Sequence, residues 1–333
     1  MTKDKLKQIL YEYRIPLADA LADRLIEEFK KEITINSELN KKLKVLSLFD
    51  GISCGMVALE RANIPVERYV AYEIDENAIK CSEFNYPQIE HKGSVVDADF
   101  SQYEGFDLLI GGSPCQDLCN MGNKQGLEGE KSKLFYEYLR ALKEVKPKYF
   151  LLENNASMTD KNKNIISELM GCDPVMIDSA NFSAQTRKRY YWTNITISDI
   201  PDKNIYLKDI IDMSDDNREN VSEQVQKYVF SGQYDGRKIN KTVKNSIREL
   251  NQKSRTIGCH AYDIASNTGI TINGGGGLYI KPTQAEFEAL QTLPKGFTSC
   301  LPIKKAVFAI GNGWTVDVIA HIFNGLKKDF RNG

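Results

Sequence analysis

A cysteine and a glutamate each follow a short apolar run, in an arrangement that suits nucleophilic chemistry. Cys115 lies on a proline-stiffened turn just after the apolar run 106–110, and Glu153 directly follows the apolar run 149–152. A thiolate is a strong nucleophile, and a carboxyl group can protonate the ring that the thiolate attacks. The pair therefore predicts addition to a pyrimidine ring that takes up a proton at the same moment.

Methyl transfer to carbon 5 of cytosine has these requirements. The carbon becomes nucleophilic only after a thiolate adds to carbon 6, and ring nitrogen 3 takes up a proton as the adduct forms. The base oxygen also needs a fixed cation or donor. Arg187 and Arg189 point the same way on an extended segment, so both are expected to reach one pocket. The alternative for these arginines is a basic stretch that binds phosphates or forms a surface ion pair.

A glycine-containing turn at 49–55 predicts the binding of a nucleotide-like ligand. It joins a predicted strand to a predicted helix, where glycine permits a tight turn and the helix amino terminus favours an anionic group. Glu73 ends the next predicted strand, about 20 residues after Gly51, where acidic side chains of such folds bind ribose hydroxyls. The alternative is a turn with a structural role alone.

Alternating strands and helices are expected to position these residues. We predict strands at 45–49, 69–72, 106–110, 149–152, 174–177 and 189–193, and helices at 54–62, 77–85, 133–145, 164–170 and 315–326. This order indicates an α/β fold with a doubly wound, mainly parallel sheet whose ligands collect at the carboxyl ends of the strands. The expected units are a helical segment 1–43, a catalytic and cofactor-binding domain 44–195, a small polar domain 196–290 and a helical segment 291–333 that packs back on the catalytic domain.

Composition excludes several classes of protein. The 333 residues carry a net charge of -1, so a polyanion site must be a local patch. Seven scattered cysteines form no CxxC pair, and three histidines stand far apart, so no metal site is expected. The first residues lack the apolar core of a signal peptide, and no apolar run approaches the roughly 20 residues that cross a bilayer. A cytoplasmic protein without a membrane partner is expected, associated with the nucleoid if it is encoded by a bacterium or phage.

Six short motifs follow one another in a fixed order: FDGISCG, YEID, GGSPCQ, ENN, QTRKR and GNGWTV. In this order they resemble the motif series of the cytosine-C5 DNA methyltransferases, over about residues 44–195 and 285–330. GGSPCQDL, PVMID and SAQTRKRYYW make the animal de novo branch the most similar. The resemblance implies the S-adenosylmethionine-dependent methyltransferase fold with a small target-recognition domain. It also implies DNA (cytosine-5)-methyltransferase activity on double-stranded DNA and a role in restriction–modification.

The same resemblance assigns the site residues. Cys115 is the nucleophile, Glu153 protonates nitrogen 3, and Arg189 holds the base oxygen with Arg187 close by. The loop 116–131 closes over a flipped cytosine, and Ser94 and Asp97 are alternatives for binding the adenine. The implied S-adenosylmethionine-binding residues are Phe49, Asp50, Gly51, Ile52, Ser53, Cys54, Glu73, Ile74, Ser94, Val95, Asp97, Pro114, Asn312 and Trp314.

A local excess of basic residues at 227–255 predicts contacts with DNA phosphates. Eight lysines and arginines there face only Asp235 and Glu249. Arg237 is a candidate reader of guanine, and a solvated helix around 242–250 is the alternative. The predicted DNA-binding residues are Gln116, Asn154, Arg237, Lys238 and Lys241. Methylation of cytosine in tRNA is the alternative activity, and the short recognition region favours pairing with a second copy of the chain.

Overall fold

A computed structural model of the chain describes residues 42–114, 133–215, 218, 233–234, 237–238, 247–263, 269–275 and 278–332. Several predictions lie outside the described residues. They concern most of the N-terminal helical segment, the nucleophile Cys115, Gln116 with the whole loop 116–131, and the side chains of Arg237, Lys238 and Lys241.

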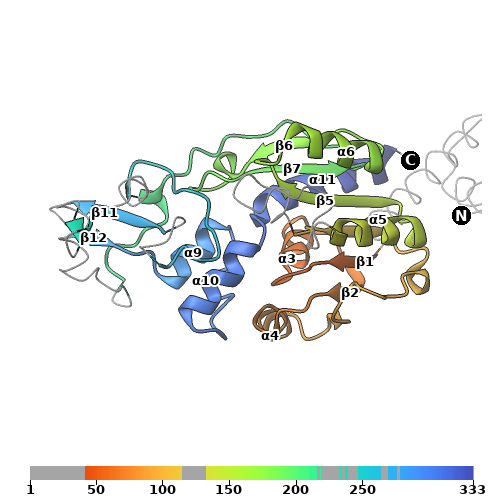
Figure 1. Cartoon of the computed structure of the whole chain (residues 1–333), viewed down its shortest axis with the longest axis horizontal. Helices are drawn as coiled ribbons and strands as arrows, with labels where there is room; N and C mark the ends of the chain where they lie inside the picture. Colours follow the sequence, from red (N-terminus) through yellow and green to blue (C-terminus); the bar gives the residue numbers. More distant parts are fainter. Residues whose placement is uncertain are drawn as a thin grey trace, which may run out of the picture.

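A seven-stranded sheet forms the centre of the described structure (Figure 1). Its strand order is β3-β2-β1-β4-β5-β7-β6. The pairs of β1, β2, β3, β4 and β5 are parallel, and β7 runs antiparallel to both β5 and β6. The strands are β1 (Leu43–Leu48), β2 (Val66–Tyr72), β3 (Glu90–His91), β4 (Leu108–Gly111), β5 (Tyr149–Asn155), β6 (Val175–Asp178) and β7 (Lys188–Thr193).

The strand order places the loops that follow β1 and β4 next to each other at one edge of the sheet. From β1 the chain passes to β2 and β3 on one side, and β4 pairs with β1 on the other side. The carboxyl ends of β1 and β4 therefore meet at a topological switch point, where α/β sheets bind ligands. The predicted mainly parallel, doubly wound sheet is confirmed, and the central strands are near-continuous apolar runs because both faces are covered.

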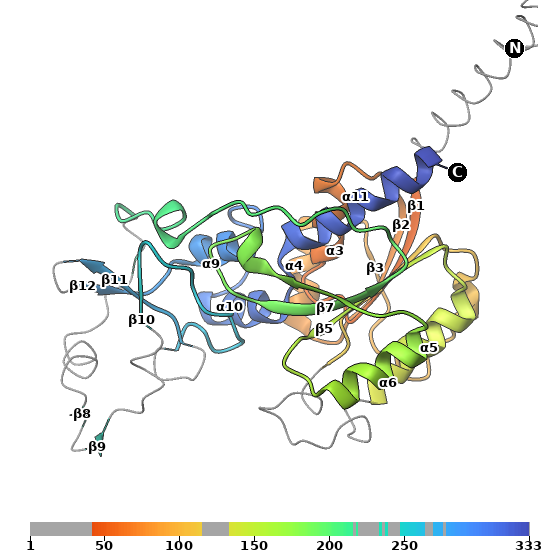
Figure 2. The same ribbon diagram turned by 90° about the horizontal axis from the view of Figure 1, so that it is seen from above.

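Helices cover both faces of the sheet, as Figure 2 shows. One apolar cluster joins the sheet to α3 (Cys54–Arg61), α4 (Glu76–Asn85), α10 (Ile303–Asn312) and α11 (Val316–Asn332). The other joins it to α5 (Lys133–Val145) and α6 (Asp160–Met170). The stretch 303–327 is long and apolar enough to cross a membrane, but 78% of its apolar window is buried in the protein. Packing against the core accounts for its apolar character.

The region after residue 194 holds more regular structure than the sequence predicts. A three-stranded sheet contains β10 (Ile247–Glu249), β11 (Thr271–Gly275) and β12 (Leu278–Ile280), and β8 (Gln233–Tyr234) pairs with β9 (Arg237–Lys238). Strand β10 lies where the alternative reading placed a helix. That alternative is wrong over 247–249, because these residues pair in parallel with β11. The helix α9 (Gln284–Leu290) packs against α10, and the predicted domain boundaries stay a prediction.

Candidate active site

The loop after β1 contains three residues with left-handed backbone conformations. Phe49, Gly51 and Ser53 have φ values of 58°, 60° and 59°. A left-handed conformation is costly for a residue with a Cβ atom, so Phe49 and Ser53 need contacts that hold them in place. This alternation turns the chain tightly at the carboxyl end of β1, directly before α3.

Asp50 is the polar centre of this loop. Its carboxylate accepts hydrogen bonds from the Ser47 hydroxyl, from the Tyr69 hydroxyl at 2.7 Å and from the Ser53 hydroxyl at 2.5 Å. Burial raises the pKa of Asp50, and the hydrogen bonds from these hydroxyls oppose that rise. The described contacts of Asp50 are therefore directed into the protein, where they shape the loop.

Glu73 joins the first loop to the end of β2. Its Oε2 accepts the Gly51 N–H at 2.8 Å, and its Oε1 accepts the N–H groups of Ile74 and Asp75 at 2.8 and 2.9 Å. The side chain of Ile74 is 74% exposed at this edge. A carboxyl group and an exposed apolar side chain thus follow each other at the carboxyl end of β2, next to the loop after β1.

The loop 94–98 continues the same edge beyond β3. Asp97 has a φ of 62°, and the Ser94 hydroxyl accepts the Val96 N–H at 3.1 Å. Arg140 of α5 holds this loop through its backbone carbonyl groups. Its guanidinium donates to the Ala98 carbonyl at 2.7 Å and to the Val95 carbonyl at 3.3 Å. Sequence reasoning missed Arg140, because nothing in its helical context marks a contact with a loop some 40 positions earlier.

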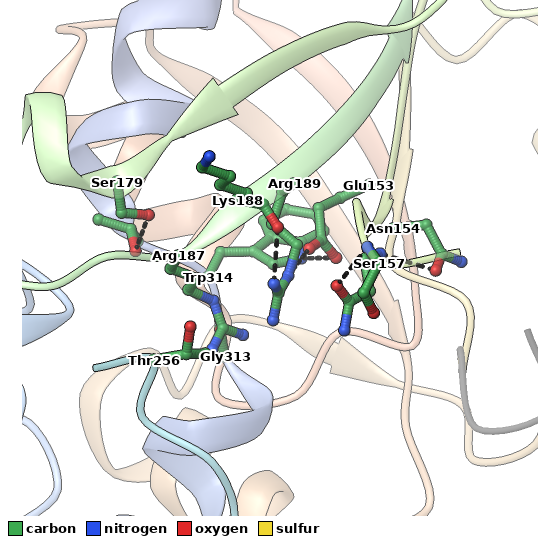
Figure 3. Close-up of polar contacts among 12 residues, drawn as sticks. Glu153, Asn154, Ser157, Ser179, Arg187, Lys188, Arg189, Thr256, Gly313 and Trp314 are labelled. Atoms are coloured by element: carbon green, nitrogen blue, oxygen red, sulfur yellow. Dashed lines mark hydrogen bonds and ion pairs between the residues drawn. The ribbon is translucent and has the colours of Figure 1, made fainter. Parts of the chain in front are cut away.

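Glu153 is held at both carboxylate oxygens. Oε1 forms an ion pair with Nε of Arg189 at 2.8 Å, and Oε2 accepts the indole N–H of Trp314 at 3.1 Å (Figure 3). Gly112 lies against this pair. A Cβ atom at that position would stand 2.9 Å from the indole nitrogen and 3.0 Å from Oε2, so the close approach requires glycine.

Arg187 and Arg189 are directed to different partners. Arg187 is buried, and it donates to the carbonyls of Ile257 at 2.9 Å, Gly311 at 3.2 Å and Gly313 at 2.9 Å. Arg187 lies directly before strand β7, which begins at Lys188. These contacts hold the turn that presents Trp314. The predicted place of Arg187 in the pocket stays a prediction.

The turn that leads to the predicted nucleophile is tied to the end of β5. The buried amide of Asn154 donates to the carbonyl and to the hydroxyl of Ser113, both at 3.2 Å. Pro114 follows, and Cys115 itself lies outside the described residues. The described contacts therefore support a positioning role for Asn154, and its contact with DNA stays a prediction.

Comparison with known proteins agrees with this geometry. The family model for C-5 cytosine-specific DNA methylase matches residues 43–328. The chain belongs to this family. The orphan methyltransferase M.SPRI of Bacillus phage SPR is 34% identical over 162 residues, which cover 45% of this chain and 37% of that protein. The type II methyltransferase M.FnuDI of Fusobacterium nucleatum is 35% identical over 136 residues, 38% of each chain. These matches span well under half of either relative.

Solved structures of methyltransferases share the fold. The S. pombe Dnmt2 methyltransferase superposes with a TM-score of 0.66 at 17% identity, over 86% of this chain and 99% of that one. The Entamoeba histolytica methyltransferase EhMeth gives a TM-score of 0.71 at 15% identity, over 87% and 99%. The predicted methyltransferase fold and family are confirmed. The finer likeness to the animal de novo branch stays a prediction.

The remaining predicted cofactor residues of this family member differ in their exposure. Ile52 and Cys54 are buried beneath the loop, and burial raises the pKa of the Cys54 thiol to about 12. Phe49 and Pro114 are partly exposed at the edge. Asn312 is exposed, and its Oδ1 accepts a hydrogen bond from the Cys259 thiol at 2.9 Å. Within the described ranges, no cluster of His, Cys, Asp or Glu could hold a metal ion.

A buried amide network was missed by sequence reasoning. Gln291 donates to the carbonyls of Ile310 at 3.0 Å and Gly313 at 3.2 Å, and its Oε1 accepts from Gln185 at 2.7 Å and Thr315 at 2.6 Å. The network therefore fixes the turn before Trp314 together with Arg187, which binds the same Gly313 carbonyl. The sequence does contain a signal for the helix that precedes Gln291. Thr283 and Glu286 have the spacing of a capping box, which marks the start of α9.

Proposed function

We propose that this chain is a DNA (cytosine-5)-methyltransferase that uses S-adenosylmethionine. The observation that carries the proposal is the placement of Glu153. Its carboxylate is fixed between Arg189 and Trp314, and it lies against Gly112, three residues before the cysteine of the PCQ turn. A carboxyl group, a guanidinium group and the turn that leads to the cysteine thus lie at one edge of the sheet. The relatives named as methyltransferases support the same activity.

The proposed mechanism gives each residue a separate task. The thiolate of Cys115 forms a bond with carbon 6 of the cytosine, and Glu153 gives a proton to nitrogen 3 as the ring electrons shift to carbon 5. Arg189 holds the base oxygen. After carbon 5 has gained the methyl group, its hydrogen leaves as a proton to solvent, the carbon–sulfur bond breaks, and nitrogen 3 returns its proton to Glu153. The thiolate and an aromatic pyrimidine are thereby restored.

The cofactor end fits S-adenosylmethionine, which supplies the methyl group when it is bound. Glu73 offers a carboxylate for ribose hydroxyls, as acidic residues at this position of the fold do. Ile74 and Val96 expose 74% and 51% of their surface on neighbouring loops, and apolar side chains of this size suit the faces of an adenine ring. Ser94 or Asp97 would bind the adenine edge, and Trp314 would lie near the methionine end.

Duplex DNA is the proposed substrate. The named relatives are a type II and an orphan methyltransferase from a bacterium and a phage, which supports a role in DNA modification in the cytoplasm. The target base must leave the stack to reach Glu153. The basic residues of 227–255, including Arg237, Lys238 and Lys241, would then contact the backbone. Pairing with a second copy of the chain stays a prediction.

One pair of assays tests the proposal and its tRNA alternative. Purified protein is supplied with S-adenosylmethionine carrying a labelled methyl group and with either duplex DNA or tRNA. We expect label in the DNA, and bisulfite sequencing of DNA from expressing cells should locate it at position 5 of cytosine. The Cys115→Ser variant is the control for contaminating activity. Label in tRNA alone would overturn the assignment to DNA.

A further inference from the structure

We propose that Ser82 and His91 are positioning residues for the loop that binds S-adenosylmethionine. Neither belongs to the six motifs, since Ser82 lies on α4 and His91 on the edge strand β3. Together they extend a line of hydrogen bonds that ends on Asp50 in the first loop. The inference rests on the proposed function, because it takes this loop to be the cofactor site.

The line consists of three consecutive contacts. Nε2 of His91 lies 3.1 Å from the Ser82 hydroxyl, which lies 2.6 Å from the Ser53 hydroxyl. The Ser53 hydroxyl donates to Oδ2 of Asp50 at 2.5 Å. Ser53 and Ser82 are fully buried, so water does not compete for these bonds. Each hydroxyl in this place depends on its protein partners.

Donor counting fixes the direction of the line. A serine hydroxyl has one hydrogen to donate. Ser53 gives its hydrogen to Asp50, so it must accept from Ser82. Ser82 donates its one hydrogen to Ser53 and must therefore accept a hydrogen bond from His91. It follows that Nε2 of His91 carries a hydrogen. The buried Nδ1 of His91 has no hydrogen-bond partner among the described residues, which suits a ring nitrogen that carries a lone pair.

The residue at the centre of this line is the one that needs support. Ser53 is left-handed, with a φ of 59°, and it precedes the first residue of α3. Its side chain makes no capping bond to the helix, because its hydroxyl is directed to Asp50 and Ser82. Two bonds on one hydroxyl thus stabilise a conformation that serine would otherwise avoid.

The line also joins the two halves of the cofactor site. Gly51 is tied to Glu73 at the end of β2, and Ser53 is tied to Ser82 two turns into the helix that follows. Asp75 caps that helix through the N–H groups of Asn77 and Ala78. The first loop is therefore fixed twice to the β2–α4 segment, so both loops are presented to a ligand as one piece.

Calorimetric titration with S-adenosylhomocysteine tests the inference. We expect Ser82→Ala and His91→Leu to weaken binding on the order of tenfold, the effect of losing one buried hydrogen bond. His91→Gln places an amide N–H near the position of Nε2 and should restore affinity to within about threefold of the wild type. Affinity for duplex DNA in the absence of cofactor should stay unchanged, whereas a general loss of structure would lower it as well.

A double-mutant cycle separates positioning from general packing. Glycine adopts left-handed conformations freely, and Ser53→Gly removes the hydroxyl that Ser82 contacts. In the Ser53→Gly background, Ser82→Ala should therefore cause no further loss of affinity for S-adenosylhomocysteine. An equal loss in both backgrounds, or equal affinities of His91→Gln and His91→Leu, would overturn the inference. A wild-type protein that fails to bind S-adenosylhomocysteine would overturn the proposed function itself.

Discussion

The two ends of the site are assembled over different distances along the chain. At the cofactor end, Asp50, Ser53 and Glu73 contact one another or near neighbours within the first three strands. At the catalytic end, Gly112, Glu153, Arg189 and Trp314 come from four separate segments. The cofactor end can therefore form from local structure, whereas the catalytic end exists only after the C-terminal segment has returned to the sheet.

Trp314 links the two ends. Its indole N–H binds Glu153, and its ring lies next to Gly55, directly after the cofactor loop, where a Cβ atom would stand 3.7 Å from the ring. Arg187 and Gln291 both bind the carbonyl of Gly313, directly before it. We therefore expect variants at the catalytic end to change turnover. Variants that remove the hydrogen bonds to the Gly313 carbonyl should instead reduce stability first.

The largest expected effect is that of Glu153→Gln. The amide cannot give nitrogen 3 a proton, so turnover should fall about a hundredfold to ten-thousandfold. Binding of S-adenosylhomocysteine should change little, since the cofactor loop makes its own contacts. Single-turnover methyl transfer and calorimetry on the same preparation provide both values. A Glu153→Gln variant that keeps wild-type turnover would remove the acid from the mechanism.

The two arginines provide a matched pair. Arg189→Ala loses a charge-assisted contact with Glu153 and should reduce turnover about ten- to hundredfold with little loss of stability. Arg187→Ala removes three hydrogen bonds to buried backbone carbonyls, of which that of Gly313 keeps a second donor in Gln291, and should lower the free energy of unfolding by about 3 kcal/mol. Urea unfolding and methyl transfer, measured on both variants, check the contrast. Equal stability losses would show that the two arginines are not functionally separate.

Gly112→Ala should have a smaller effect, on the order of tenfold in turnover. The added methyl group would stand about as close to the indole nitrogen as to Oε2 of Glu153, so one of the two must move. The measurement is kcat with saturating S-adenosylmethionine, alongside the thermal midpoint. Wild-type turnover together with an unchanged midpoint would mean that Glu153 and Trp314 need not be held in this arrangement.

The smallest effect is expected at the second cysteine of the site region. With a pKa of about 12, Cys54 is almost wholly a thiol at pH 8 and should resist iodoacetamide. Inactivation by this reagent should therefore follow modification of Cys115, as peptide mass spectrometry can map. Cys115→Ser should abolish the fast modification, and early alkylation of Cys54 would contradict the assigned burial.

The sequence predicted the sheet better than it predicted the contacts. Strands β1, β2, β4 and β5 were predicted to within a few residues, because buried parallel strands are continuous apolar runs. Strand β3 was missed because it contains only Glu90 and His91, both polar. The antiparallel direction of β7 has no local signal, and α10 was missed because its end merges with the GNGWTV motif.

In the site, the motifs predicted which residues matter but not how they pair. Nothing in QTRKR distinguishes Arg187, which binds carbonyls, from Arg189, which binds Glu153. The contact of Trp314 with Glu153 joins positions 161 apart, and Ser82 joins the cofactor loop from a helix that carries no motif. Such contacts join segments that lie far apart in the sequence, so the residues around each partner do not predict them.

Covalent trapping tests the central claim most directly. Duplex DNA in which 5-fluorocytosine replaces cytosine is incubated with the protein and S-adenosylmethionine, then denatured. Because fluorine cannot leave as a cation, the adduct cannot resolve, and the account predicts a denaturation-resistant complex that forms with the wild type and not with Cys115→Ser. Absence of any such complex, from a preparation that methylates the unmodified duplex, would contradict nucleophilic attack by Cys115.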